Sequence, residues 1–114
     1  MGEIVKGARK SIILIDNYID DSVLTLLSKR RRDVSAVIYT QRMSKQLNLD
    51  IDKHNSQYEP IQINEFSNSH DRFLIIDEEE VYFISASIKD LGKKWFAFSK
   101  INIDVNYLLR KLKE

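Results

Sequence analysis

The sequence predicts a mixed α/β domain in which a partly parallel sheet is flanked by helices. The first observation is a continuous apolar run at residues 11–16, which is typical of a central strand covered on both faces. The second is the helical spacing of apolar residues within 23–27, after Asp20, Asp21 and Ser22, any of which can cap a helix. The third is another apolar run at residues 34–40. A strand, a helix and a strand within about thirty residues predict a right-handed crossover and parallel strands.

The remaining elements follow from shorter patterns. We expect residues 4–9 to end a helix, 43–58 to form a second helix that ends in a loop, and 60–66 to form a short strand. Residues 72–77 and 81–87 predict an antiparallel hairpin, and 95–101 predict a last strand. Residues 105–112 predict an amphipathic helix with Val105, Leu108, Leu109 and Leu112 on one side.

Length and composition limit the class of protein. A chain of 114 residues suffices for a single core, so we expect residues 1–114 to form one domain. The composition, 43% hydrophobic and 31% charged with one proline, excludes a disordered or linker-dominated chain. The absence of cysteine excludes a disulfide scaffold and fits a cytoplasmic location. The longest apolar run, residues 12–15, is too short for a membrane span, and no secretory signal pattern opens the chain.

The charge is balanced overall but uneven along the chain. Eighteen basic and seventeen acidic residues give a net charge of +1, which predicts no global attraction to nucleic acid or membrane. Residues 89–114 nevertheless hold seven basic and three acidic side chains, so a local basic surface is expected there. A second basic cluster, residues 29–32, is expected to end a helix, where cations offset the negative end of the helix dipole.

The segment from Ser69 to Asp77 holds the candidate catalytic residues of the chain. No glycine-rich phosphate loop, zinc-protease motif or serine-hydrolase motif occurs, so no metal or cofactor is predicted. In an extended strand, His70 and Arg72 share one face, and a histidine beside a fixed cation suits the handling of a phosphodiester. Ser85 and Ser87, across the hairpin, are candidate hydrogen-bond donors. The alternative is a turn or rim histidine and an Arg72 that simply pairs with an acid of the hairpin.

Three further groups of residues have both an ordinary and a functional interpretation. Asn17, Tyr18 and Asp20 follow the first strand and suit a turn with a helix cap, or a ligand site at the carboxyl end of that strand. Lysines flank three aromatic residues, Trp95, Phe96 and Phe98. These aromatic residues can pack in the core, or they can stack on bases while the lysines bind phosphate. His54 lies among polar residues and is expected to be solvated and without a role.

The spacing of His70, Arg72 and Asp77, followed by Ser85-Ala86-Ser87, resembles the motif of the phospholipase D superfamily: His-x-Lys, four residues, Asp, then a small Gly/Ser strand. The resemblance extends over residues 4–101 and implies a phospholipase D-like mixed sheet flanked by helices. It further implies that one histidine attacks phosphorus while a second protonates the leaving oxygen. Because the chain has one motif, this mechanism requires a homodimer that brings together two copies of His70.

The resemblance assigns roles to individual residues. It implies catalytic roles for His70, Arg72 and Asp77 and phosphate binding by Ser85, Ser87 and Lys89. Arg72 replaces the usual lysine, and Ser85 stands where glycine is common, so these positions depart from the motif.

Three functions are therefore compatible with the sequence. The first is a phosphodiesterase or nuclease that acts as a homodimer. The second is a catalytically degenerate module that binds nucleic acid or phosphate, and the third is an assembly or sensor domain. The segment 70–101 is similar to the C-terminal part of bacterial proteins of unassigned function, some with a phage-type DNA-binding domain upstream, so the chain is interpreted as a domain of a longer protein.

Overall fold

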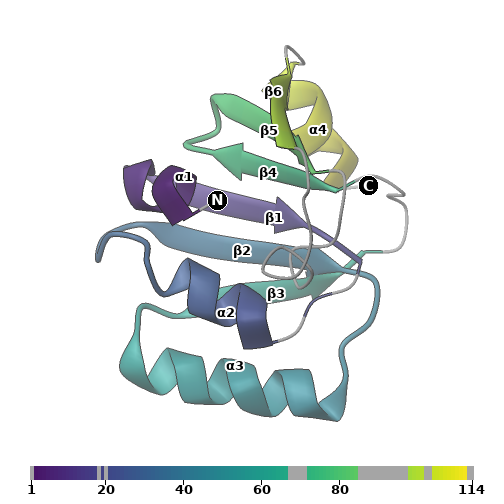
Figure 1. The fold of residues 1–114 in the computed structure, drawn as a ribbon. Coiled ribbons are helices and arrows are strands. Elements are labelled where there is room, and N and C mark those ends of the chain that lie inside the picture. The colour runs from purple at the N-terminus through teal and green to yellow at the C-terminus, as the bar shows by residue number, and fades with distance from the viewer. Residues whose placement is uncertain are drawn as a thin grey trace.

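Six strands form one mixed sheet in the order β3-β2-β1-β4-β5-β6 (Figure 1). The computed structural model describes residues 2–17, 19, 21–66, 72–84, 98–101 and 104–112. The strands are β1 (Ser11–Ile15), β2 (Ser35–Thr40), β3 (Ile61–Glu65), β4 (Phe73–Ile76), β5 (Glu80–Ile84) and β6 (Phe98–Ile101). The helices are α1 (Gly2–Gly7), α2 (Asp21–Leu27), α3 (Lys45–Gln57) and α4 (Val105–Leu112). None of the described helices has the length and apolar composition needed to cross a bilayer.

The parallel half of the sheet confirms the predicted crossover. β1 pairs in parallel with β2, and β2 pairs in parallel with β3, so the chain makes two successive crossovers, through α2 and α3. β4 pairs antiparallel with the other side of β1, which places β1 in the middle of the sheet as predicted. The predicted hairpin is β4 with β5, and β6 continues the antiparallel half. Residues 85–87 and 95–97 of the predicted strands lie outside the described residues.

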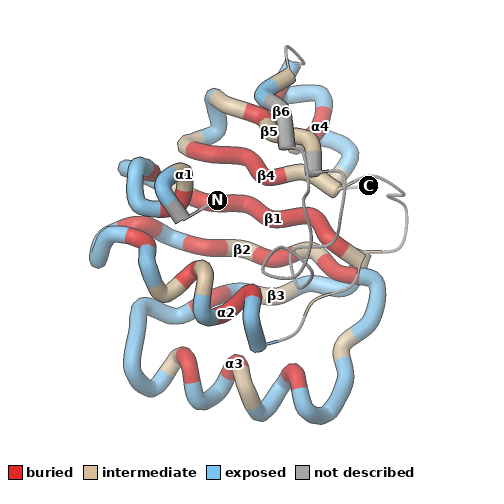
Figure 2. The backbone as a smooth tube through the Cα atoms, viewed as in Figure 1, coloured by how far each residue is buried: buried red, intermediate tan, exposed pale blue. Residues whose placement is uncertain are grey.

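Two apolar clusters cover the two faces of the sheet. Alternate residues of β1 divide between them, because successive side chains of a strand point to opposite faces. Ile12 and Leu14 belong to the larger cluster, which buries the apolar sides of α1, α2 and α3. Ile13 and Ile15 belong to the smaller cluster, together with Val105 and Leu108 of α4. Figure 2 shows the resulting continuous buried band along β1, which explains why its sequence is apolar without alternation.

The basic cluster at residues 29–32 does more than offset a helix dipole. Arg30 is buried, and its guanidinium donates to the backbone carbonyls of Leu27 at 2.9 Å, Val34 at 3.1 Å and Glu59. Arg30 therefore connects the end of α2 with the residue before β2 and with the segment that follows α3. α2 ends at Leu27 and has no basic residue in its last turn, so the cluster follows the helix instead of forming its end as predicted.

The prediction that His54 is solvated is wrong. His54 lies on the inner side of α3 and is 6% exposed, with Nε2 at 3.3 Å from Arg30 Nη1 and its ring stacked on Tyr58 at 4.8 Å. Since a guanidinium only donates, Nε2 accepts and the proton of the neutral ring belongs on Nδ1. Burial lowers the pKa of His54, and the charge of Arg30 lowers it further. The sequence does not reveal this position, because Lys53 and Ser56 beside it are exposed and Asn55 is a polar residue that bonds to the start of β3.

We expect acid to destabilise the fold through His54. Because the pKa of His54 is lower in the folded than in the unfolded chain, the unfolded chain takes up the proton first as pH falls. The free energy of unfolding should therefore fall as pH drops below about 6.5, by at most about 1.4 kcal/mol per pH unit. Urea unfolding should be measured between about pH 7.5 and about pH 5. The His70→Gln variant is used as the background because it removes the other histidine, so that only His54 titrates as an imidazole. His54→Gln, which keeps an acceptor for Arg30, should remove the slope; an unchanged slope would contradict the assignment.

Candidate functional site

A polar row crosses the sheet at the carboxyl end of the parallel strands. Two apolar rows precede it, in which Ile12 and Leu14 of β1 lie opposite residues 36 and 38 of β2 and opposite residues 76 and 74 of β4. The same registers, continued by two residues, place Asp16 between Thr40 and Arg72. The backbone follows this continuation, because the Asp16 N–H donates to the carbonyl of Tyr39 at 3.1 Å. Three polar side chains thus replace an apolar row on the face covered by α1, α2 and α3.

Asp16 and Arg72 form an ion pair across β1 and β4. The distance from Arg72 Nε to Asp16 Oδ1 is 3.5 Å. The Asp16 side chain has no exposed surface, whereas that of Arg72 is 29% exposed. A buried carboxylate without a partner would be strongly unfavourable, so the pair anchors the guanidinium at the sheet edge. Each side chain also takes part in interactions beyond this pair.

Thr40 adds a buried hydroxyl to the row. Its side chain is fully buried, and within the described part of the chain its Oγ1 has no hydrogen-bond partner. Buried hydroxyl groups normally have a partner. We therefore expect a bound water or ligand atom to reach Thr40 at this edge.

Asp77 lies at the opposite end of β4 from Arg72, about 15 Å away at the usual rise of a strand. Its carboxylate accepts hydrogen bonds from the backbone N–H groups of Arg9, Lys10 and Ser11, at 2.7–3.2 Å. Burial alone would raise the pKa of Asp77, but these hydrogen bonds outweigh it and hold the pKa below its usual value. The structure thus does not bring Asp77 to Arg72; it places this motif residue against the turn between α1 and β1.

The other predicted site residues, His70, Ser85, Ser87 and Lys89, lie outside the described residues, as do Tyr18, Asp20 and the aromatic residues at 95 and 96. β4 begins one residue after Arg72, and β5 ends at Ile84, so the chain reaches both undescribed segments from the edge that carries the polar row. Within the described ranges, no group of three or more His, Asp or Glu side chains is placed to hold a metal ion.

Sequence reasoning missed the role of Asp16. The sequence shows an acid directly after a strand that is apolar on both faces, and that position alone suggests a turn or helix cap. The register of β4 against β1 is what shows that Arg72 is the partner of Asp16, and this register is known only from the folded sheet. Asn17, half-buried at the same edge, follows Asp16 directly.

Asp77→Ala should lower the free energy of unfolding by about 1–3 kcal/mol, because three backbone N–H groups lose a charged acceptor and Ala disfavours the positive φ of 57°. Asp77→Asn should cost less, since Asn keeps one acceptor and tolerates that backbone conformation. Chemical denaturation checks both, with the exposed neighbour changed in Glu79→Ala as the control. Equal losses for Asp77→Ala and Glu79→Ala would contradict the role of Asp77.

The ion pair should appear as coupling in a double-mutant cycle. Arg72→Gln leaves Asp16 buried without its cation, so we expect a loss of about 2–4 kcal/mol in the free energy of unfolding. Asp16→Asn together with Arg72→Gln should recover at least about 1 kcal/mol relative to the sum of the single changes. Additive losses would show that the two side chains do not stabilise one another.

Comparison with known proteins bears on the fold. No protein-family profile matches the sequence, and no curated protein matches it either. Among solved structures, NucT from Helicobacter pylori superposes with a TM-score of 0.63 at 13% identity, over 98% of this chain and 80% of NucT. TrmBL2, an archaeal chromatin protein whose structure shows a novel mode of DNA binding, superposes with a TM-score of 0.61 at 18% identity. That match covers 98% of this chain and 44% of TrmBL2. At such identities the likeness concerns the fold alone, and the chain accordingly shares the mixed α/β fold of these two structures.

Proposed function

We propose that this domain is a phosphodiesterase that acts on nucleic acid, with its site at the carboxyl edge of β1 and β4. The observation that carries the proposal is the anchoring of Arg72 by the fully buried Asp16. A guanidinium held in this way presents a positive charge in a fixed place, which suits the anionic oxygens of a phosphodiester. His70 precedes Arg72 by two residues, as the resemblance to the phospholipase D motif requires.

In the proposed reaction the two copies of His70 in a homodimer have different tasks. One imidazole forms a bond to phosphorus while the bond from phosphorus to the leaving oxygen breaks. The imidazolium of the other copy gives its proton to that oxygen. This second imidazole then takes a proton from water, whose oxygen displaces the phosphohistidine nitrogen. Arg72, Ser85, Ser87 and Lys89 hold the phosphate oxygens, and Asp77 supports the strand that carries the motif.

Nucleic acid is the substrate class that the remaining observations favour. Residues 89–114 have a surplus of four positive charges in a chain whose net charge is only +1. Such local asymmetry suits contact with a phosphate backbone. The fold shared with TrmBL2, described as showing a mode of DNA binding, is compatible with the same class of ligand.

A second candidate, nucleic-acid binding without hydrolysis, is favoured by one observation. The pairing with Asp16 neutralises part of the charge on Arg72, and a forked guanidinium stands where the motif has a compact ammonium. Phosphate binding tolerates this change better than the geometry of phosphoryl transfer does.

The test compares hydrolysis and binding of fluorescent single-stranded and duplex DNA by the purified chain. His70→Ala should lower hydrolysis by about a hundredfold or more and leave binding nearly unchanged. The double variant Asp16→Asn with Arg72→Gln removes the cation at position 72 without leaving a buried charge. It should weaken DNA binding, and the salt dependence of the binding constant should fall by the equivalent of about one phosphate contact. Arg9→Gln, a change at an exposed arginine, is the matched control.

The outcomes separate the candidates. Binding that depends on Arg72, with no hydrolysis by the wild-type chain, would select the binding module. Neither hydrolysis nor binding would overturn both proposals. If two protomers share one site, mixing wild-type chain with His70→Ala chain should lower hydrolysis in proportion to the square of the wild-type fraction; a linear fall would exclude the shared site.

A further inference from the structure

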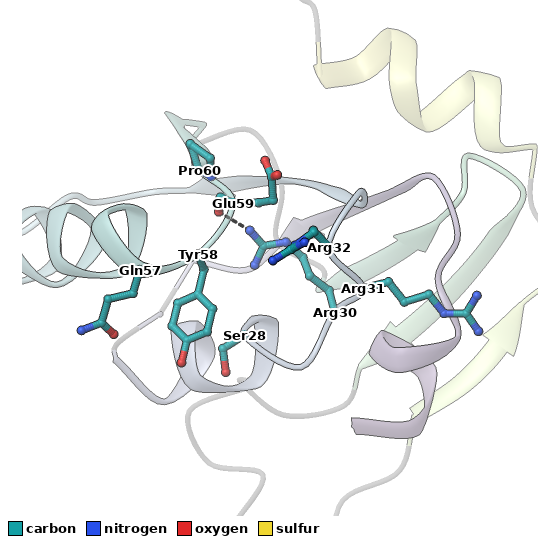
Figure 3. Close-up of a pocket in the computed structure, with 8 residues that line it drawn as sticks. All are labelled: Ser28, Arg30, Arg31, Arg32, Gln57, Tyr58, Glu59 and Pro60. Atoms are coloured by element: carbon teal, nitrogen blue, oxygen red, sulfur yellow. Dashed lines mark hydrogen bonds between the residues drawn. The ribbon is translucent and has the colours of Figure 1, made fainter.

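A pocket lies at the opposite, amino edge of the parallel strands, just beyond the ends of α2 and α3 (Figure 3). Its volume is about 480 Å³, which lies within the usual range for ligand sites. The length of a parallel strand, about 15–20 Å, separates this pocket from the edge that carries Arg72. We call it the amino-edge pocket; its chemistry comes from Ser28, Arg30, Arg32, Gln57, Tyr58 and Glu59.

Arg30 gives the amino-edge pocket a fixed positive charge. Figure 3 shows its guanidinium bonded to the carbonyl of Glu59, and further bonds run to Leu27 and Val34. The carboxyl ends of two helices would by themselves repel an anion. Arg30 occupies carbonyl groups at both ends and offsets that field. Because the side chain is already immobilised, an anion bound here would not have to order it.

Tyr58 supplies an exposed aromatic surface in the same pocket. The ring stacks on His54 with an angle of 29° between the planes, which holds it in place. The residue is nevertheless 47% exposed, one of the three most exposed large apolar side chains in the described ranges. An aromatic ring that is supported on one side and exposed on the other is a platform for a planar group.

The rim of the pocket adds an exposed cation. Arg32 is exposed, whereas Arg31 extends away from the pocket in Figure 3 and its Nε donates to the carbonyl of Lys6 at 3.0 Å. The lining holds three arginines and one acid, Glu59, so it favours an anionic ligand. Ser28 and Gln57 contribute a hydroxyl and an amide that can hydrogen-bond to a polar ring edge.

We propose that the amino-edge pocket binds one nucleotide unit of single-stranded nucleic acid. The base stacks on Tyr58, and its phosphate lies against Arg32 and the fixed charge of Arg30. A stacking platform combined with arginines is the chemistry by which proteins hold unpaired bases, whereas a duplex keeps its base faces covered. The inference goes beyond the hydrolytic site and shares with the proposed function only the class of ligand.

The test measures binding of a fluorescent oligothymidylate of about twelve nucleotides, which is about the length of one single-strand binding site. The protein is the full chain carrying Asp16→Asn and Arg72→Gln, because these changes weaken binding at the carboxyl edge. In this background Tyr58→Ala should lower affinity about fivefold or more, and Tyr58→Phe should retain it. Arg32→Gln should lower the salt dependence by about 0.7 in the logarithmic slope, and Arg9→Gln should not. Loss of hydrolysis or of Arg72-dependent binding in the parent chain would count against the proposed function alone.

A titration of the ¹⁵N-labelled wild-type chain with the same oligonucleotide provides a readout that needs no variant. Amide shifts should change at Ser28, Gln57 and Tyr58. Adenosine monophosphate, as a second probe, separates a free nucleotide from a strand: similar affinity for both would replace the strand by a nucleotide ligand and overturn the proposal as stated. Shifts confined to the carboxyl edge, or equal affinity of the Tyr58→Ala and Tyr58→Phe chains, would overturn it as well.

Discussion

The burial of β1 on both faces is the constraint on which the structure depends. β2 and β4 occupy both edges of β1, and apolar clusters cover both of its faces, so any polar side chain on it needs a partner inside the protein. The first charged residue after the strand, Asp16, lies within this environment and pairs with Arg72 on the neighbouring strand. The candidate site is therefore a consequence of how the central strand ends, since the same register that stacks the apolar rows brings the two charges together.

At the amino ends of the parallel strands, side chains of both charges hydrogen-bond to the backbone. At the amino edge, the carboxylate of Asp77 accepts from three backbone N–H groups that precede and begin β1. At the same edge, the guanidinium of Arg30 donates to carbonyl groups at the ends of two helices. Each charged side chain thus replaces hydrogen bonds that regular secondary structure leaves unmade. Asp77 thus connects the end of β4 to the turn between α1 and β1.

An arginine at position 72 can make contacts that a lysine cannot. A guanidinium has five N–H donors in a planar fork, so it can pair with a carboxylate through Nε and still have other donors elsewhere on the group. An ammonium is a point charge and does not divide its donors between two separated partners in this way. The pairing of Arg72 with Asp16 therefore still leaves donors on the guanidinium for a second partner.

The sequence by itself determined the order and type of the elements, the central position of β1 and the parallel crossover, because the apolar periodicity of residues 11–16, 23–27 and 34–40 reports burial directly. It also singled out Arg72 and Asp77 as candidate site residues through their spacing, but the structure does not bring the two together. Only the tertiary structure decided that Asp16 pairs with Arg72, that Asp77 contacts the α1–β1 turn, and that His54 is buried against Arg30. Each of these contacts joins residues at least 24 positions apart. Local patterns report which side of an element is covered, but partners across a sheet or between a helix and a loop are set by register and packing.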